Sequence, residues 1–427
     1  MSTAQRQVRT SAEVGWPLLL VLASLAAVAP VATDLYLPGF PQLRDDLGVS
    51  ASAVQLTLTA FLAGLAAGQL VMGPLSDRYG RRRPLIASAA VCVAAGVVCA
   101  LAPNLGVLVA ARLVQGFAGA GGMVIGRAVI ADLVTGRVAA KAFTLMLTVG
   151  GVAPVLAPFV GGLLADAVGW RGMLWTVAGL CAAMLVGVVV VLRETRPPEA
   201  RTATRTSYAA GLRVVVGTRG YWPPVAVLAL SFAMMMAYIA ASPFVYQDVV
   251  GLSAVGYGVA FGVNAVGLIS AGWVTSRLVD RIDPARLVRA CMSVQLAATL
   301  TFVLLAASGA PTWLLPAPIL VAVATNGGVM GNSAALAMSQ VREVAGTGSA
   351  VLGCTQFTLG ALVSPLVGLG GEDSAVVPAV VMATASLLGW LVSRARPRGR
   401  RPRRAAGGAA TPPPGPSRDA GASAPTR

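Results

Sequence analysis

The chain has 427 residues, of which 56% are hydrophobic and only 11% are charged, and it contains no histidine. Soluble domains carry about 25% charged residues, so the low charged fraction excludes an ordinary soluble fold. The absence of histidine excludes imidazole metal sites, Ser-His triads and histidine proton relays. A net charge of +16 on a soluble protein would suggest nucleic acid. Here the basic residues gather in short loops and tails between apolar segments, which indicates membrane topology and no nucleic-acid partner.

Twelve apolar segments are long enough to span a bilayer, which takes about 20 residues. They lie at residues 16–37, 53–75, 84–102, 105–125, 143–165, 172–192, 222–246, 255–274, 287–307, 314–338, 348–369 and 375–392. The pattern predicts an all-α integral membrane protein with two six-helix bundles, at residues 16–192 and 222–392. Residues 1–15 are then a cytoplasmic tail, 193–221 a cytoplasmic linker, and 393–427 a disordered basic tail.

The basic residues also predict the orientation. With the N-terminus in the cytoplasm, all but three of the 32 basic residues lie in cytoplasmic segments. Only Arg44 and Arg171 remain on the opposite side, and Arg112 lies within a span. The positive-inside rule therefore places both termini in the cytoplasm.

The most specific motif is the loop GPLSDRYGRRR, which begins at Gly73. A loop that only sets the membrane orientation requires arginine, but it does not require glycine at positions 73 and 80 or aspartate at position 77. The loop resembles the G-x-x-x-D-R-x-G-R-R motif of the major facilitator superfamily, in which Asp and Arg join a charge network that latches the two halves. The resemblance implies a latch formed by Gly73, Asp77, Arg78, Gly80 and Arg81, with Asp132 as an acidic partner.

The first span ends in TDLYLPGFP, which places Asp34 within or at the mouth of an apolar segment. An acidic residue at such a position is a functional candidate, although Asp34 could also simply lie at the water interface. The segment resembles the T/S-D-x-Y-L-P-x-x-P signature of the Bcr/CflA (bicyclomycin and chloramphenicol resistance) exporters. That resemblance implies a drug exporter driven by proton antiport.

The fourth span carries Arg112, Gln115 and Gly116 in an R-x-x-Q-G pattern. An arginine at a span centre costs about 2.5–3.5 kcal/mol on insertion scales, so it needs a counter-charge or a water-filled cavity. At 1.5 Å per residue, Arg112 and Asp34 both fall in the outer half of the membrane, so a direct or water-bridged coupling is expected. The pattern resembles the superfamily motif that is linked to proton transfer.

The fifth span has proline and glycine on one helical face, a pattern less generic than small-residue packing alone. It resembles the exporters' antiporter motif G-P-x-x-G-G, except that Ala157 replaces its first glycine. The residues on this face are Gly150, Pro154, Pro158, Gly161 and Gly162.

Weaker candidates complete the predicted site. Polar and adaptable apolar side chains within the spans could line a substrate cavity or simply pack; we select Tyr36, Met146, Met235, Tyr238, Asn264 and Gln356. The five cysteines lie in apolar segments without C-x-x-C spacing, so we expect small packing residues and no metal site.

The sequence therefore predicts a proton-coupled antibiotic exporter of the bacterial inner membrane, with no cofactor besides the coupling proton, acting as a monomer on a small amphiphilic drug. A proton-coupled uptake permease and a non-transporting membrane protein remain alternatives. An enzyme and an ATP-driven pump are disfavoured, because neither a catalytic constellation nor a G-x-x-x-x-G-K-[ST] motif is present.

Overall fold

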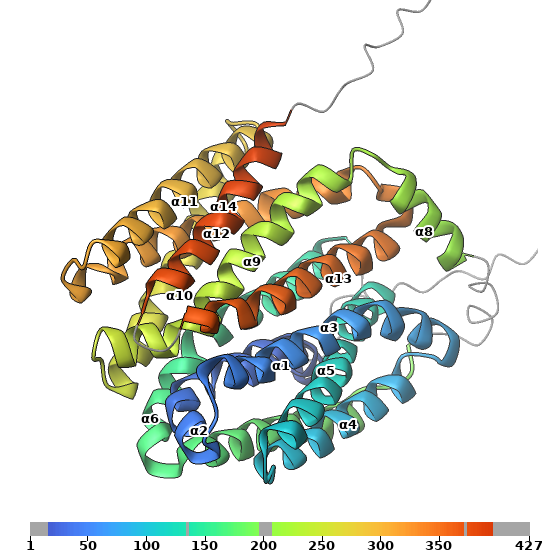
Figure 1. The fold of residues 1–427 in the computed structure, drawn as a ribbon. Helices are drawn as coiled ribbons and strands as arrows, with labels where there is room; N and C mark the ends of the chain where they lie inside the picture. Colours follow the sequence, from blue (N-terminus) through green and yellow to red (C-terminus); the bar gives the residue numbers. More distant parts are fainter. Residues whose placement is uncertain (1–15, 134–135, 196–206, 371–373, 396–427) are drawn as a thin grey trace, which may run out of the picture. The chain divides into compact units, whose positions relative to one another are not determined.

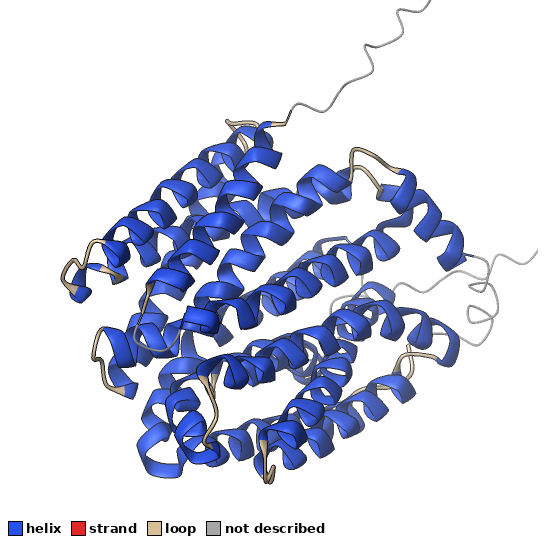
Figure 2. Ribbon diagram, viewed as in Figure 1, coloured by secondary structure: helices blue, strands red, loops and turns tan. Residues whose placement is uncertain are grey.

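The computed structural model describes residues 16–133, 136–195, 207–370 and 374–395, and every regular element within these ranges is a helix (Figure 2). The predicted tails at residues 1–15 and 396–427, and part of the predicted linker, lie outside the described residues. The described residues up to Arg394 form one compact unit. The all-α membrane fold expected from the sequence is confirmed.

The N-terminal half comprises the helices that run up to Val191 (Figure 1). Their bounds are α1 (Trp16–Asp34), the 3₁₀ turn η1 (Leu37–Gly39), α2 (Phe40–Leu47), α3 (Ala51–Tyr79), α4 (Arg82–Ala100), α5 (Leu105–Leu133) and α6 (Gly136–Val191).

The C-terminal half begins after a further short helix, α8 (Ser207–Gly217). It comprises α9 (Trp222–Phe244), the π-helical turn η2 (Val245–Val249), α10 (Ala254–Leu278), α11 (Pro284–Ala307), η3 (Thr312–Leu314), α12 (Pro316–Ser339), η4 (Arg342–Val344), α13 (Ala345–Val363), η5 (Ser364–Gly370) and α14 (Val376–Arg394).

Eleven helical stretches of the described chain are long and apolar enough to cross a membrane. The difference from the twelve expected spans arises in α6, which contains two helices that meet at Gly169 without an intervening loop. Gly169 has φ 63° and ψ −177°, a conformation that glycine adopts without a steric penalty. The fifth and sixth predicted spans are therefore the two parts of α6.

Four elements described here were not expected from the sequence. The first helix ends at Asp34 rather than at residue 37, and η1 and α2 follow it. Helix α8 lies within the predicted linker, where Val215 packs in a cluster with Tyr221 and Val341. The eleventh span ends at Val363 and continues as η5, because Pro365 cannot donate the next helical hydrogen bond.

Local capping fixes several of the helix starts. The hydroxyl of Ser50 accepts a hydrogen bond from the Ala53 amide at the start of α3, and Ser253 does the same for the Gly256 amide in α10. Asp283 accepts from the Ala285 amide, next to Pro284 in the first turn of α11. These side chains satisfy amides that have no partner within the helix.

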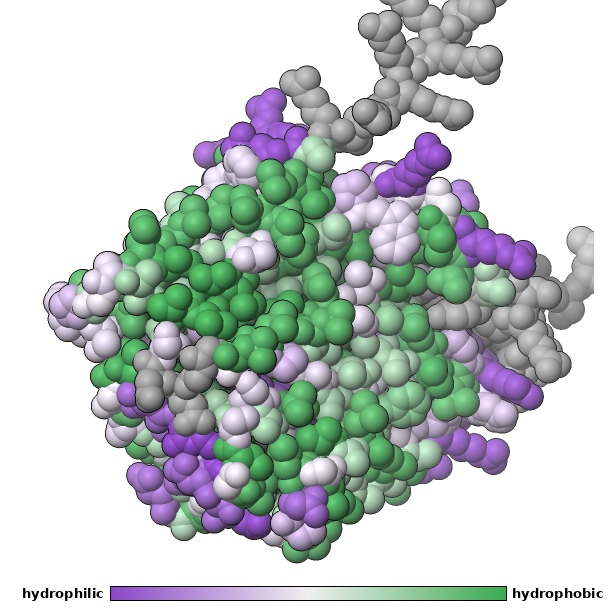
Figure 3. Space-filling view, in the orientation of Figure 1, coloured by the Kyte–Doolittle hydropathy of each residue, from purple (hydrophilic) through white to green (hydrophobic). Residues whose placement is uncertain are grey.

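The surface fits a bilayer. Figure 3 shows apolar side chains over the middle of this face and hydrophilic side chains along opposite margins. Large apolar residues are exposed on the long helices, among them Leu163, Leu304 and Leu362. In water such a surface would be an aggregation hazard, whereas lipid chains cover it without cost.

The two halves pack together mainly through α3 against α13 and α6 against α10. We call the end of the compact unit that carries α2 the α2 end, and the opposite end, at the α3–α4 turn, the Arg81 end. Gly80 makes that turn with φ 88°, a value that disfavours residues with a side chain.

Candidate functional site

Asp34 is the last residue of α1, and only 3% of its surface is exposed. This burial excludes the alternative that its carboxylate lies in water in this conformation. The Thr33 hydroxyl is 2.8 Å from the Asp34 Oδ1 atom, and also 3.0 Å from each of the carbonyl oxygens of Ala29 and Pro30. A hydroxyl has one proton, so Thr33 can donate to an ionised Asp34, or accept from a protonated Asp34 while it donates to the backbone.

Hydroxyl groups of the C-terminal half lie near Asp34. Its carboxylate interacts electrostatically with Tyr238 and Tyr257. The Asn264 amide donates to the hydroxyl oxygens of Tyr238 and Tyr246, at 2.9 and 3.0 Å, and Tyr257 is 3.1 Å from the Ser242 hydroxyl. All of these side chains are buried, so Asp34 of one half lies within electrostatic range of a hydrogen-bonded tyrosine cluster of the other.

Arg112 is completely buried in α5. Its Nη1 donates to the Gln115 Oε1 at 2.7 Å, and its Nη2 donates to the Ala32 carbonyl at 2.8 Å. The guanidinium carbon lies 4.6 Å from the ring centroid of Tyr36 and 4.4 Å from that of Phe61. Two aromatic faces and two hydrogen bonds thus hold the cation.

The sequence predicts a direct or water-bridged coupling of Asp34 with Arg112, and the direct form is absent in this conformation. Among the described residues, neither side chain forms a salt bridge. Arg112 instead contacts the backbone of α1 two residues before Asp34.

The halves are closed against each other at the α2 end. Arg44 in α2 pairs with Asp248 in η2 at 3.2 Å, and the Gln247 amide donates to the Pro38 carbonyl at 3.2 Å. In addition, the side-chain amide of Gln55 in α3 donates to the Ala240 carbonyl in α9 at 3.1 Å. These contacts join helices of opposite halves and have to break if this end opens.

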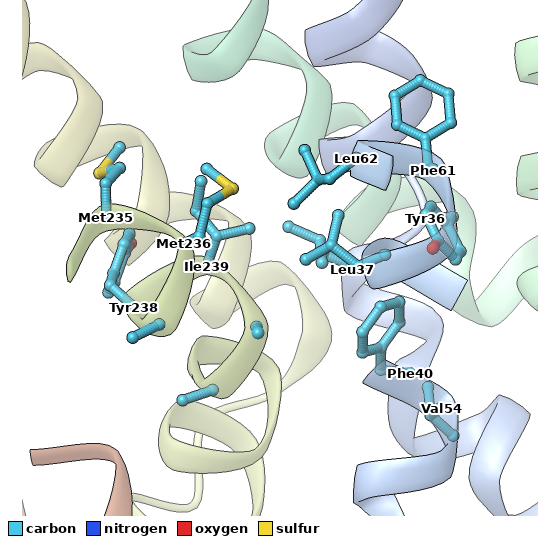
Figure 4. Packing of buried hydrophobic residues seen from close by; sticks show 14 of the residues in the cluster. Tyr36, Leu37, Phe40, Val54, Phe61, Leu62, Met235, Met236, Tyr238 and Ile239 are labelled. Carbon is cyan, nitrogen blue, oxygen red and sulfur yellow. The ribbon is translucent and has the colours of Figure 1, made fainter. Parts of the chain in front are cut away.

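An apolar layer lies beside these polar contacts. Figure 4 shows Leu37 and Leu62 of the N-terminal half pointing toward Met236 and Ile239 of α9. Each of these side chains is buried. The layer joins the halves by apolar side-chain packing, and such packing can part without leaving unpaired polar groups.

The glycine pair of α6 lies at the contacts between helices. A Cβ atom on Gly161 would collide with the carbonyl oxygen of Leu35, at the end of α1. A Cβ atom on Gly162 would lie 2.5 Å from the carbonyl oxygen of Ala254, at the start of α10. The closeness of α6 to α10 at the α2 end therefore depends on the absence of a side chain at Gly162.

At the Arg81 end, a buried arginine binds two carboxylates. Arg81 Nη1 donates to Asp77 at 2.8 Å and to the Ser76 hydroxyl at 2.7 Å, and its Nε donates to Asp132 at 2.8 Å. Burial would lower the pKa of Arg81, but the hydrogen bonds and charges of Asp132 and Asp77 outweigh burial and raise it. Arg81 is therefore fixed as a cation.

Glu194 adds a further carboxylate to this end. Its two oxygens accept from the backbone amides of Arg81 and Arg82, at 2.8 and 3.2 Å. These amides begin α4, where a carboxylate stabilises both the unpaired amides and the helix dipole. The Arg82 Nε donates a hydrogen bond to the carbonyl oxygen of Leu192 at 2.7 Å. The end of α6 is thereby tied to the start of α4.

The sequence profile described as Major Facilitator Superfamily matches residues 22–365, which is most of the chain. The chain belongs to the Major Facilitator Superfamily. This family assignment agrees with the loop motif at Gly73 and identifies the protein as a multi-pass membrane protein of a transporter family rather than an enzyme family.

Similar proteins of this superfamily occur in several bacteria. A protein of Bacillus subtilis named "Uncharacterized MFS-type transporter YdgK" is 34% identical over 88% of this chain and 94% of its own. The "Bicyclomycin resistance protein homolog" of Haemophilus influenzae is 29% identical over 84% and 90%. "Multidrug resistance protein MdtL" of Klebsiella pneumoniae is 27% identical over 88% and 95%. The resemblance to the Bcr/CflA family is thus confirmed.

Solved major facilitator structures share the fold. A D-xylose–proton symporter superposes with a TM-score of 0.70 at 16% sequence identity, over 88% of this chain and 97% of that one. An inward-facing, unoccupied bacterial homologue of the lysosomal transporter Spinster gives a TM-score of 0.67 at 15% identity, over 88% and 96%. At these identities the likeness establishes the fold alone.

The structure gathers part of the predicted site. Tyr36, Met235, Tyr238 and Asn264 lie in or beside the layer between the halves. Met146 instead lies in a separate cluster of the N-terminal half, near Leu25 and Ile125. Gln356 is half-buried on α13, and Pro154, Pro158 and Gly150 lie within α6. Gly73 has room beside Val124, and Arg78 is exposed over the Tyr79 ring.

The predicted latch is assembled, and its role between the halves stays a prediction. The contacts of Arg81 described above connect α3, α4 and α5, and Glu194 adds the end of α6. These elements all belong to the N-terminal half. In this conformation the network therefore holds that half together at the Arg81 end.

Three groups were missed by sequence reasoning. Thr33 enters the sequence prediction only as part of the TDLYLPGFP signature, and Tyr257 and Glu194 do not enter it. Tyr257 and Ser242 meet across 15 positions of sequence, and Glu194 meets Arg81 across 113. No local spacing reveals such pairs, although an acidic residue in a strongly basic segment was a signal that could have singled out Glu194.

We expect Glu194→Ala to destabilise the protein by about 0.5–2 kcal/mol, the usual range for the loss of a helix cap. The start of α4 would lose two hydrogen bonds and a favourable charge. Thermal unfolding in detergent measures the change. Glu343→Ala, in η4, is the matched control and should leave the melting temperature unaltered. Equal effects of the two substitutions would contradict a specific role for Glu194.

We expect Gly162→Ala to impair transport by holding α6 away from α10 at the α2 end, because a Cβ atom would lie 2.5 Å from the Ala254 carbonyl oxygen. Gly179→Ala, in the same element, is the control, since nothing lies within 4 Å of that position. Spin-label distances across the α2 end should lengthen in the first variant only. Unchanged distances and transport in Gly162→Ala would contradict the proposed contact.

Proposed function

We propose that this protein is a proton-coupled drug exporter that exchanges a small amphiphilic antibiotic for protons by alternating access. In this proposal it works as a monomer in the bacterial inner membrane, with both termini in the cytoplasm, so that the α2 end faces outward. The outward face then carries Arg44 and Arg171, whereas the Arg81 end holds the basic loop expected inside.

The observation that carries the proposal is the position of Asp34 between the halves. Its carboxylate is buried at the end of α1, lies within electrostatic range of the tyrosine cluster of the C-terminal half, and has the Thr33 hydroxyl within hydrogen-bond distance. A group in this position meets water when either end opens. It can therefore bind a proton from one side and release it to the other, and Thr33 can serve both protonation states.

Side chains of the C-terminal half suit an amphiphilic substrate. Met235, Met236 and Phe232 present apolar, adaptable surface from α9, and methionine is typical of binding surfaces that accept several ligands. Tyr238 and Asn264 provide hydroxyl and amide groups. A substrate with an aromatic or alicyclic body and a few hydrogen-bonding groups, such as a chloramphenicol-like or bicyclomycin-like compound, matches this combination.

The relatives give the proposal its cargo class. Two of the similar proteins carry names that refer to bicyclomycin resistance and multidrug resistance. The Pro and Gly residues of α6 resemble the antiporter motif of exporters, and two of them mediate the contacts of α6 with α1 and α10. These features support export over uptake.

Flux in inverted membrane vesicles with an acidic interior tests the proposal. There the cytoplasmic face is outside, so an exporter accumulates added drug in the vesicle while protons leave. Chloramphenicol or bicyclomycin should therefore partly collapse the pH gradient in vesicles that contain the protein, but not in empty ones. Gradient-driven movement of substrate out of the vesicles would identify an uptake permease and overturn the proposal.

A growth assay identifies the transported drug and tests whether its export depends on Asp34. Expression of the chain in an exporter-deficient strain should raise the inhibitory concentration of at least one compound in an antibiotic panel. Asp34→Asn should not raise it, although the variant reaches the membrane. No protection by the wild-type chain against any of the compounds would exclude drugs of that panel as its cargo.

A further inference from the structure

Two thiols meet inside the N-terminal half, away from the site described above. The sulfur atoms of Cys92 in α4 and Cys181 in α6 are 3.9 Å apart, and both side chains are buried. In this state one thiol donates a hydrogen bond to the other. The two residues are 89 positions apart in sequence, which is why the spacing of the cysteines indicated packing residues alone.

A small cavity adjoins the thiol pair. Its volume is about 20 Å³, and its lining includes Cys92, Cys181, Ser88 and the thioether-bearing Met184. A cavity needs about 10–15 Å³ to hold one water molecule, so this one has room for a single atom-sized guest. Three sulfur-bearing side chains on two helices thus border one small space.

The spacing of the thiols fits a metal ion rather than a disulfide. Metal–thiolate bonds of about 2.3 Å that diverge by about 120°, as in a trigonal site, place two sulfur atoms about 4.0 Å apart. The observed separation is 3.9 Å. A disulfide requires about 2.05 Å, so the two sulfur atoms would have to move closer together to form one. A bound ion requires no such movement.

The positive charge of the buried Arg112 also favours a metal ion bound by the two thiols. Arg112 interacts electrostatically with Cys92 and with Cys181, and among the described residues it pairs with no carboxylate. A monovalent cation bound by two thiolates forms an anionic complex. The buried guanidinium would compensate that charge, which an isolated site in the membrane could not easily carry.

We propose that Cys92, Cys181 and Met184 form a binding site for a soft monovalent cation of the copper(I) or silver(I) type. Soft thiolate and thioether ligands select such ions over hard cations. Each thiol loses its proton to water as its sulfur donates an electron pair to the metal, so the reaction is M⁺ + 2 RSH → [M(SR)₂]⁻ + 2 H⁺. Met184 donates a lone pair without losing a proton. No oxidant or reductant is needed.

Silver(I) binding to the purified full chain tests the site. The chain has three other cysteines, so the reference protein is C99S/C291S/C354S, which keeps only the pair. After desalting, elemental analysis should find one Ag⁺ per chain. Adding C92S or C181S should weaken binding by about 100-fold, and M184L by about tenfold.

Further measurements keep the test decisive. X-ray absorption on the silver-loaded reference protein should show two or three sulfur neighbours; a single one would overturn the proposal. So would retention of one Ag⁺ by C92S, or a thiol assay that finds the pair oxidised in protein prepared under argon. C92A/C181A serves if a serine variant misfolds, and gel filtration with circular dichroism verifies its fold.

Discussion

Asp34→Asn is expected to abolish drug transport driven by a pH gradient while the protein still folds and binds drug. The amide has nearly the shape of the carboxylate but cannot take up and release a proton. The variant should therefore still exchange labelled drug for unlabelled drug across a vesicle membrane without a gradient. Both fluxes are measured in the same vesicles, so loss of coupling is distinguished from loss of protein.

Asp46→Asn is the matched control for Asp34. Asp46 lies in α2 and pairs with the half-exposed Arg171, where an ion pair contributes little. Its substitution should leave gradient-driven transport close to the wild-type rate. Normal gradient-driven transport by Asp34→Asn would show that another group carries the proton.

A substitution at Thr33 tests the neighbouring hydroxyl. Thr33→Val keeps the shape of the side chain but cannot bond to Asp34, whereas Thr33→Ser retains the hydroxyl. We expect the valine variant to slow proton-coupled transport several-fold and the serine variant to stay near wild type. Transport rates as a function of the pH gradient measure this, and equal slowing by both variants would indicate a packing role instead.

Arg112→Lys is expected to lower the free energy of unfolding by about 1–3 kcal/mol and to slow transport strongly. Lysine keeps the charge, but it cannot bond to Gln115 and to the Ala32 carbonyl in the same fork while it stacks between two rings. The end of α1 would then lose a tether two residues before Asp34. Thermal unfolding in detergent and vesicle transport measure the two effects.

Arg171→Lys provides the comparison for Arg112. Arg171 also stacks on an aromatic ring, with 4.1 Å between its guanidinium carbon and the Trp170 centroid, but 42% of its side chain is exposed. Water screens its interactions, so we expect no measurable loss of stability. If the buried and the exposed arginine tolerate lysine equally, Arg112 is not the tether that its contacts suggest.

Sequence reasoning reached the fold because a bilayer imposes long apolar helices. It anticipated the Gly80 turn and the Arg81–Asp77 contact, since these residues are four or fewer positions apart. It also singled out Asp34 and Arg112, because each is costly in an apolar span.

The sequence could not show how those costly residues are accommodated. Arg112 was expected to couple with Asp34 directly or through water. The structure shows it bonded to the Ala32 carbonyl and to Gln115 and stacked on two rings, partners that carry no charge and leave no trace in a charge pattern. The tyrosine cluster likewise forms only because side chains of α9 meet those of α10, which brings Tyr238 next to Asn264 and Ser242 next to Tyr257. Helix α8 was missed because its polar flanks resemble a linker.

The direct junction within α6 limits which length changes the chain can tolerate. One residue inserted beside Gly169 would rotate the second part of α6 by about 100° relative to the first. Trp170 would turn away from Asp46, and Cys181 would turn away from Cys92. Gly309, between α11 and η3, has open space around it. We therefore expect an epitope tag inserted at Gly309 to be tolerated, and an insertion at Gly169 to disrupt the fold.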